Sequence, residues 1–233
     1  MGAHRLKSCM TGKAGPRPID YICDMAKVKN IDTLSLDSSI LCCNFVNTLS
    51  SWKEPGTHDY LDSYGTFLKW CRKTGAGSED LLQKLEGSEQ KGGQRQKAAL
   101  KEIKACRDLL QNFLSAIANG DRPGQSALLP KIDLLLREAG SREYLEYGDG
   151  RFSLGHEEDP QELLAPLWRI IGSLKGLLID NDPARIKECP SCGWIFLDET
   201  KNGGRIWCNP KICGTRDKMK RYNERKRESR IKK

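Results

Sequence analysis

Four cysteines near the C-terminal end have the spacing of a metal site. Cys189 and Cys192 are separated by two residues, Cys208 and Cys213 by four, and fifteen residues lie between the pairs. Four thiolates complete the tetrahedral shell that Zn²⁺ takes in structural sites, with no position left for a reactive water. The sequence therefore predicts one structural zinc ion. The alternatives, disulfide pairing or plain packing, fit two such close pairs poorly.

The residues around these cysteines suit a small zinc-bound hairpin. Gly193 directly follows the first pair, where the chain must turn tightly. Trp194, Phe196 and Trp207 can cover the metal site with a small apolar core. A module of this size cannot fold on burial alone, and metal binding supplies about 10–16 kcal/mol in comparable zinc peptides.

The segment after the cysteines carries the chain's excess positive charge. Residues 201–233 contain thirteen Lys and Arg against three Asp and Glu, a charge of +10, so the rest of this +8 chain carries −2. A basic segment on a near-neutral body is typical of a protein that binds polyanions. A basic helix is expected over 214–228, and a solvated, disordered tail is the alternative. The candidate nucleic-acid contacts are Arg205, Arg216, Lys218, Lys220, Arg221, Arg225, Lys226 and Arg227.

The same charge serves two kinds of nucleic acid. A basic helix can enter the major groove of DNA or follow its phosphates, and DNA is the expected partner. RNA or the ribosome is the alternative, because Trp194, Trp207 and Tyr222 could stack on bases. An enzyme is not expected, since His58 and His156 lie far apart and belong to no recognisable catalytic set.

The remaining sequence points to the cytoplasm. The other six cysteines are scattered, as expected of reduced thiols rather than of a disulfide framework. No apolar run reaches the roughly 18–20 residues of a membrane span, and no signal peptide is recognisable at the N-terminus. We therefore expect a cytoplasmic protein without a membrane partner.

The elements that must position these residues are mainly helical. Apolar residues recur at helical spacing, and Ser78 is placed to cap a further short helix. Around Gly148-Asp149-Gly150 the period changes to that of a β-hairpin. The 160–180 segment is apolar on more than one face, so it should be the central buried helix. The longer expected helices span 38–50, 58–73, 94–118, 126–139 and 160–180.

These elements predict a mainly α fold in three parts. Residues 1–30 are expected to be a disordered extension, and 31–185 a helical domain with one small β-hairpin. Residues 186–233 should form a zinc finger made of a β-hairpin and a basic helix. The turn Asn181-Asp182-Pro183 marks the boundary.

Polar residues interrupt the apolar face of the first expected helix. Asn44, Asn47 and Thr48 could line a small-molecule pocket, which would give the helical domain an effector. The alternative, which we favour, is that they bond neighbouring helices in the core or cap a helix end.

The cysteine segment resembles a known family. The run Cys189-x2-Cys-Gly-Trp-x-Phe-x-Asp198, followed by Arg205-x-Trp-Cys-x4-Cys-Gly-x-Arg-x-Lys218, is similar to the CGNR zinc finger. In that family the finger follows a helical ABATE domain in proposed transcription regulators of bacteria. Asn44-Phe-Val-Asn-Thr48 resembles a motif at the start of that domain, so the resemblance covers about residues 37–227.

The resemblance implies DNA binding through the finger, and sensing or dimerisation through the helical domain. A homodimer is also expected because one small finger reads few base pairs. The chain departs from the family at two positions. Thr215 stands where the family has Asn in Cys-Gly-Asn-Arg, and Asn44 replaces the usual Asp before Phe-Val-Asn-Thr. The first change affects any Asn-specific contact, not the metal site.

Overall fold

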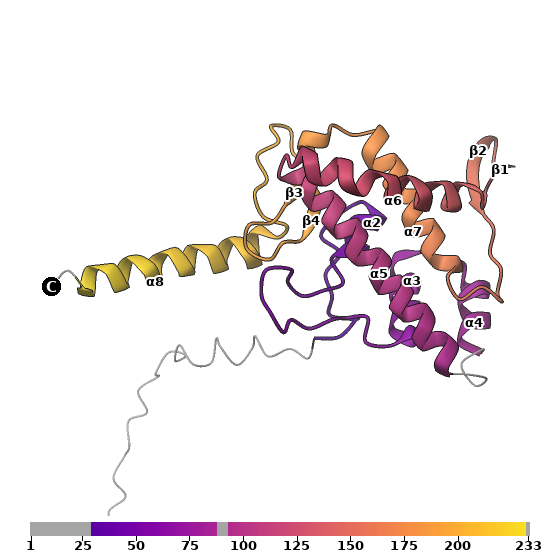
Figure 1. Ribbon diagram of the computed structural model, residues 1–233, viewed down its shortest axis with the longest axis horizontal. Coiled ribbons are helices and arrows are strands. Elements are labelled where there is room, and N and C mark those ends of the chain that lie inside the picture. The colour runs from indigo at the N-terminus through magenta and orange to yellow at the C-terminus, as the bar shows by residue number, and fades with distance from the viewer. Residues whose placement is uncertain (1–28, 88–92, 232–233) are drawn as a thin grey trace, which may run out of the picture.

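The fold is mainly α-helical, with two small antiparallel hairpins. The computed structural model describes residues 29–87 and 93–231 (Figure 1), so nearly all of the expected extension over 1–30 lies outside the described residues. The helices are α2 (Leu41–Val46), α3 (Tyr64–Thr74), α4 (Glu79–Gly87), α5 (Gly93–Ala118), α6 (Arg122–Gly140), α7 (Ala165–Ile179) and α8 (Thr215–Ile231). The strands are β1 (Glu143–Gly148), β2 (Arg151–His156), β3 (Ile186–Glu188) and β4 (Ile195–Leu197).

The first two helices are shorter than their apolar periodicity predicts. The chain leaves α2 at Asn47 and runs as a loop to α3, with one β-bridge between Leu49 and Asp59. Ser63 fixes the start of α3 with a capping box, in which its Oγ accepts the Thr66 N–H at 3.1 Å. Apolar residues such as Leu61 are fully buried in the loop. Burial outside a helix therefore produced the helical pattern here.

The later helices follow the pattern closely. The predicted helix over 94–118 is α5, which runs for 26 residues. Ser78 caps α4 as expected, accepting the Leu81 N–H at 3.1 Å. The segment expected to be central is α7, which packs against α2 and α6 and buries most of its apolar side chains.

One hydrophobic core runs from the helical body into the finger. It includes helix residues such as Ile103 and Ile171, and also Ile195 and Phe196 of β4. Strands β3 and β4 pack directly on α5, and β4 also packs on α2. The domain boundary at residue 185 stays a prediction, but the buried core continues across it.

The two ends of the molecule differ in character (Figure 1). The hairpin β1–β2 lies at one end, where Asp149 and Gly150 form its two-residue turn with φ values of 52° and 77°, as a type I′ turn requires. Helix α8 extends from the opposite end into solvent, beyond the other elements. Among the described helices, none combines the length and apolar character needed to cross a bilayer.

Candidate metal centre and nucleic-acid interface

The four predicted cysteines converge at one point. Their Sγ atoms all lie within 4.8 Å of one another, with separations of 3.5 Å for Cys192–Cys208, 3.6 Å for Cys208–Cys213 and 3.7 Å for Cys192–Cys213. Sulfurs bound at about 2.3 Å to a tetrahedral zinc ion would lie about 3.8 Å apart. All four side chains are buried. The donor set and its geometry therefore fit a closed metal site.

The first cysteine pair sits on a tight knuckle. The Gly193 N–H donates to the Cys189 carbonyl at 2.9 Å, and the Cys189 N–H donates to the Trp194 carbonyl at 2.8 Å. Gly193 has a φ of 78°, and a Cβ there would lie 2.8 Å from the Cβ of Trp52. Only glycine satisfies both the backbone conformation and this close approach.

The second pair leads directly into the basic helix. Asn209 caps the π-helical turn Pro210–Gly214, with its Oδ1 accepting the N–H groups of Lys211 at 3.1 Å and Ile212 at 3.2 Å. This turn contains Cys213 and continues without a break into α8. A metal ion on Cys213 would therefore hold the first turn of the basic helix in place.

The finger is bonded to the helical body through Asn47. Its Nδ2 donates to the Ile195 carbonyl at 2.8 Å, and its Oδ1 accepts the Ile195 N–H at 2.9 Å. The Asn47 amide thus pairs with the backbone of Ile195 in β4 as a neighbouring strand would. Asn47 is 1% exposed, so both bonds are shielded from water.

The zinc knuckle is held by the loop that follows α2. The backbone N–H of Trp52 donates to the Cys192 carbonyl at 2.8 Å, and the indole Nε1 of Trp194 donates to the Leu49 carbonyl at 2.7 Å. From α5, Gln111 Nε2 donates to the Gly193 carbonyl at 3.0 Å. The metal site is therefore built against the helical body rather than on a free module.

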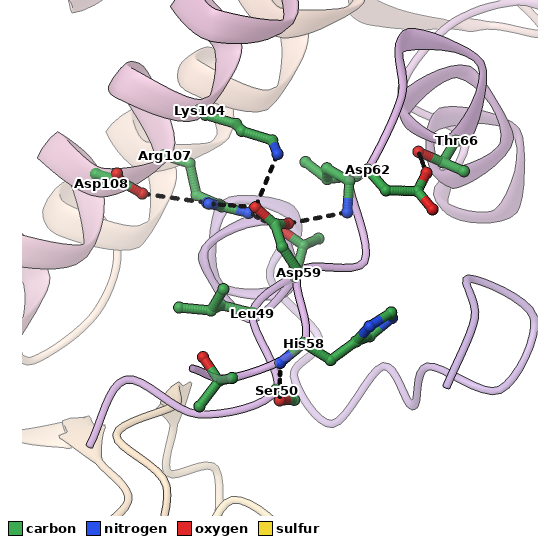
Figure 2. A network of polar contacts seen from close by, with 12 residues as sticks. Leu49, Ser50, His58, Asp59, Asp62, Thr66, Lys104, Arg107 and Asp108 are labelled. Atoms are coloured by element: carbon green, nitrogen blue, oxygen red, sulfur yellow. Dashed lines mark hydrogen bonds and ion pairs between the residues drawn. The ribbon is translucent and has the colours of Figure 1, made fainter. Parts of the chain in front are cut away.

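A partly buried ion cluster around Arg107 fixes this loop to α5 (Figure 2). The Arg107 guanidinium holds the Asp59 carboxylate at 2.7 and 3.1 Å, and Lys104 Nζ lies 2.9 Å from the same carboxylate. Burial alone would raise the pKa of Asp59, but Arg107 and Lys104 lower it below its ordinary value. Sequence reasoning missed this cluster. A charged Arg107 beside the buried Cys106 on an amphipathic helix was the available signal.

A fully buried carboxylate, Asp198, organises the loop between the cysteine pairs. Asp198 accepts bonds from Lys187 Nζ at 2.6 Å, Thr200 Oγ1 at 2.6 Å and the Arg205 N–H at 2.9 Å. Burial would raise the pKa of Asp198, but Lys187 and these hydrogen bonds hold it well below its usual range. Asp198 belongs to the resembling motif, but the sequence did not reveal this role.

Arg205 stands apart from the other predicted nucleic-acid contacts. Its guanidinium donates to the Asp37 carbonyl at 2.8 Å and the Trp207 carbonyl at 3.1 Å, and also to the Cys208 carbonyl. It also lies over the Phe196 ring at 4.5 Å. Arg205 therefore ties the finger loop together, and its donors point inward.

The other predicted contacts lie together on α8, and all are exposed. Among these, Arg221 bonds Asp217 at 2.5 Å, an i,i+4 pair on the helix surface. The exposed set is Arg216, Lys218, Lys220, Arg221, Arg225, Lys226 and Arg227. These cations are accessible to a large polyanion.

The three candidate pocket residues are engaged in internal bonds. Asn44 bonds the backbone of Ser38 through both its amide atoms, at 3.2 and 2.8 Å. Thr48 Oγ1 donates to the Phe45 carbonyl at 2.8 Å, and Asn47 bonds Ile195 as described above. All three side chains thus hydrogen-bond within the protein, and a pocket lined by them stays a prediction.

Two family models match successive parts of this chain. A family model described as the CGNR zinc finger matches residues 185–226. The ABATE model, described as a putative stress-induced transcription regulator, matches residues 40–180, which is more than half of the chain. A comparison with curated proteins gives no match.

Proposed function

We propose that this chain, which belongs to the ABATE family and carries a CGNR zinc finger, is a transcription regulator that binds DNA through α8. The observation that carries the proposal is the placement of α8. A 17-residue basic helix leaves the body directly from Cys213, with its described side chains almost entirely exposed. One zinc ion on the four cysteines would act as a structural clamp that fixes the direction of this helix.

Duplex DNA suits this helix better than RNA does. An isolated α-helix fits the major groove of B-form DNA, whereas the deep and narrow major groove of A-form RNA excludes side chains. Of the three aromatic residues considered for stacking on RNA bases, Trp194 is buried and Trp207 is half-buried, and only Tyr222 is exposed. The same features favour a binding protein over an enzyme.

A salt titration tests the proposal. The full zinc-loaded chain and a labelled random-sequence duplex are compared by fluorescence anisotropy, with the DNA affinity expected to fall by a log–log slope of about −0.9 per phosphate contacted. Replacing both Arg225 and Lys226 by Ala should weaken binding and flatten the slope. The control is Arg151→Ala, an exposed arginine at the distant hairpin, which should change neither.

Two results would overturn the proposal. Tighter binding of a structured RNA at matched salt would replace DNA with RNA as the partner. Unchanged DNA affinity after removal of zinc by a strong chelator would mean that the finger does not position the binding helix.

We also propose that the helical body dimerises through the hairpin β1–β2. One hairpin face carries four apolar side chains and no charge between them, namely Leu145, Tyr147, Phe152 and Leu154, which are 52–70% exposed. From typical aromatic areas, these leave about 500 Å² of apolar surface per copy. Two copies would bury about 1,000 Å² in total, which reaches the lower limit of a specific interface.

A second copy suits this hairpin face because it offers an equally apolar and uncharged surface. The hairpin also lies at the opposite end from α8 (Figure 1), so a dimer would leave both basic helices free. Leu145→Glu should convert a dimer to a monomer in analytical ultracentrifugation, whereas Glu146→Gln on the other face should not. A wild-type monomer at high concentration would remove the dimer from the proposal.

A further inference from the structure

The acidic residues of α8 form one narrow stripe. An α-helix turns about 100° per residue, so Asp217, Glu224 and Glu228, which are seven and four residues apart, lie within about 40° of one another. A phosphate backbone would be repelled along this stripe. Arg221 borders this stripe, about 40° from Asp217, and pairs with that carboxylate. Glu224 and Glu228 have no such ion pair among the described residues, so the stripe marks the side of α8 least suited to face nucleic acid.

The side opposite the acidic stripe carries Met219, Tyr222 and Lys226. By the same rotation these positions are centred about 180° from the acids. Met219 and Tyr222 are 61% and 59% exposed, although they are the largest apolar groups between Thr215 and Ser229. Nothing in the described chain covers them.

Two basic rows flank this face. Lys218 and Arg225 lie about 90° to one side, and Arg216, Lys220 and Arg227 lie on the other. All five side chains are exposed. The helix surface is thus divided into an acidic side, two basic sides and one mixed side that carries apolar groups.

This division matches the surroundings of a helix in the major groove of DNA. Such a helix has base edges in front of it and one phosphate strand on each side. Apolar side chains contact the thymine methyl group, and lysine donates to guanine O6 and N7. Two like-charged rows would repel a second α8, so the charges favour a polyanion over helix pairing.

We propose that Met219, Tyr222 and Lys226 read the bases, that the two basic rows grip the two phosphate strands, and that the acidic stripe faces solvent. This assignment rests on the proposed DNA binding and adds to it the orientation of the helix and the residues that set specificity. It predicts bound sites that contain thymine and guanine where α8 inserts.

The experiment begins with selection of bound sequences from a random DNA pool by the full zinc-loaded chain. Affinities for the selected site and for a scrambled duplex are then measured for three double variants with unchanged zinc content. One removes the proposed base contacts (Met219→Ala with Tyr222→Ala), one removes a phosphate row (Lys218→Ala with Arg225→Ala), and one neutralises the acidic stripe (Glu224→Gln with Glu228→Gln).

Each variant has a distinct expected result. Loss of the base contacts should lower affinity for the selected site about ten-fold or more, with little change on the scrambled duplex. Loss of the phosphate row should weaken binding to both duplexes and reduce the slope of affinity against salt by about 2. Neutralising the stripe should leave both affinities unchanged or raise them.

Other results overturn the assignment. If the Met219 and Tyr222 double variant keeps the selected-site preference, or if neutralising the acids weakens binding, α8 faces DNA in another orientation. If that first variant instead loses self-association in ultracentrifugation, the mixed face is a protein contact. Failure of the wild-type chain to bind any duplex would reject the proposed function itself, and the assignment with it.

Discussion

The two hairpins in the described part of the chain show that strand length and structural anchoring are separate properties. The hairpin β1–β2 has six residues in each strand, whereas β3–β4 has three. Yet the longer hairpin exposes most of its side chains, and β4 is buried along its whole length. The shorter hairpin is held by contacts from elsewhere, and the longer one mainly by its own ladder.

Contacts of two kinds hold β3–β4. The cysteine cluster and Asn47, which pairs with the Ile195 backbone, join it to the rest of the protein. Within the hairpin, Asp198 just after β4 accepts a bond from Lys187 of β3. At the base of the hairpin β1–β2, Lys175 bonds Glu143 at 2.5 Å, and Arg142, just before β1, bonds Glu162 at 3.0 Å. Removing the anchors of β3–β4 one at a time should therefore destabilise that hairpin much more than equivalent changes destabilise β1–β2.

The largest effect is expected from Cys192→Ser. Loss of one thiolate should release the metal and forfeit much of the roughly 10 kcal/mol or more that zinc binding contributes to such modules. Zinc content by plasma emission spectroscopy should fall from one equivalent to near zero, and the backbone amides of β3–β4 should lose protection from hydrogen exchange while β1–β2 keeps its own. Cys106→Ala, outside the cluster, is the control. Retention of stoichiometric zinc by Cys192→Ser would show that the ligand set is wrong.

Next in size is a matched pair of phenylalanines, one in each hairpin. Phe196 in β4 is 0% exposed and Phe152 in β2 is 70% exposed. Phe196→Ala should lower the free energy of unfolding by about 3–5 kcal/mol through lost burial and an added cavity, and Phe152→Ala by less than about 0.5 kcal/mol. Urea unfolding of the zinc-loaded chain at a concentration that keeps it monomeric measures both. Similar losses in the two variants would contradict the comparison.

Asn47→Ala should have a somewhat smaller effect. It leaves the buried N–H and carbonyl of Ile195 without partners, at about 1–3 kcal/mol for each group. Unfolding in urea should show a loss of about 2–4 kcal/mol, with zinc bound more weakly. Asn44→Ala is the control, because its bonds join only neighbouring residues outside the finger. Equal losses at the two positions would mean that Asn47 does not couple the body to the finger.

The smallest effect expected is a change in acid sensitivity on replacing Asp198. Because the pKa of Asp198 is lower in the folded chain than the unfolded value near 3.9, its stabilisation is complete above that value. It is lost as pH falls through the folded pKa. Asp198→Asn should lower stability at pH 7 by about 2 kcal/mol and flatten the dependence of unfolding free energy on pH below about 5. The control is Asp149→Asn in the exposed turn of β1–β2. An unchanged slope would show that Asp198 does not contribute to acid unfolding.

The sequence by itself determined the features that depend on near neighbours. Two close cysteine pairs define a metal site because their spacing already brings ligands together, and the period of apolar residues over 94–118 defines α5. The basic segment was likewise visible as a count of charges. A helix surface also follows directly from the order of its residues, so the four sides of α8 are encoded locally.

Only the tertiary structure decided which distant groups meet. Asn47 lies 148 residues from Ile195, and Arg107 lies 48 residues from Asp59, so no local pattern pairs them. The tertiary structure also turned Arg205 inward, where three backbone carbonyls accept its donors, and ended α2 at Val46 so that the next residues could reach the finger. Periodicity records that a residue is buried. It does not record which partner buries it, because that depends on how the elements pack.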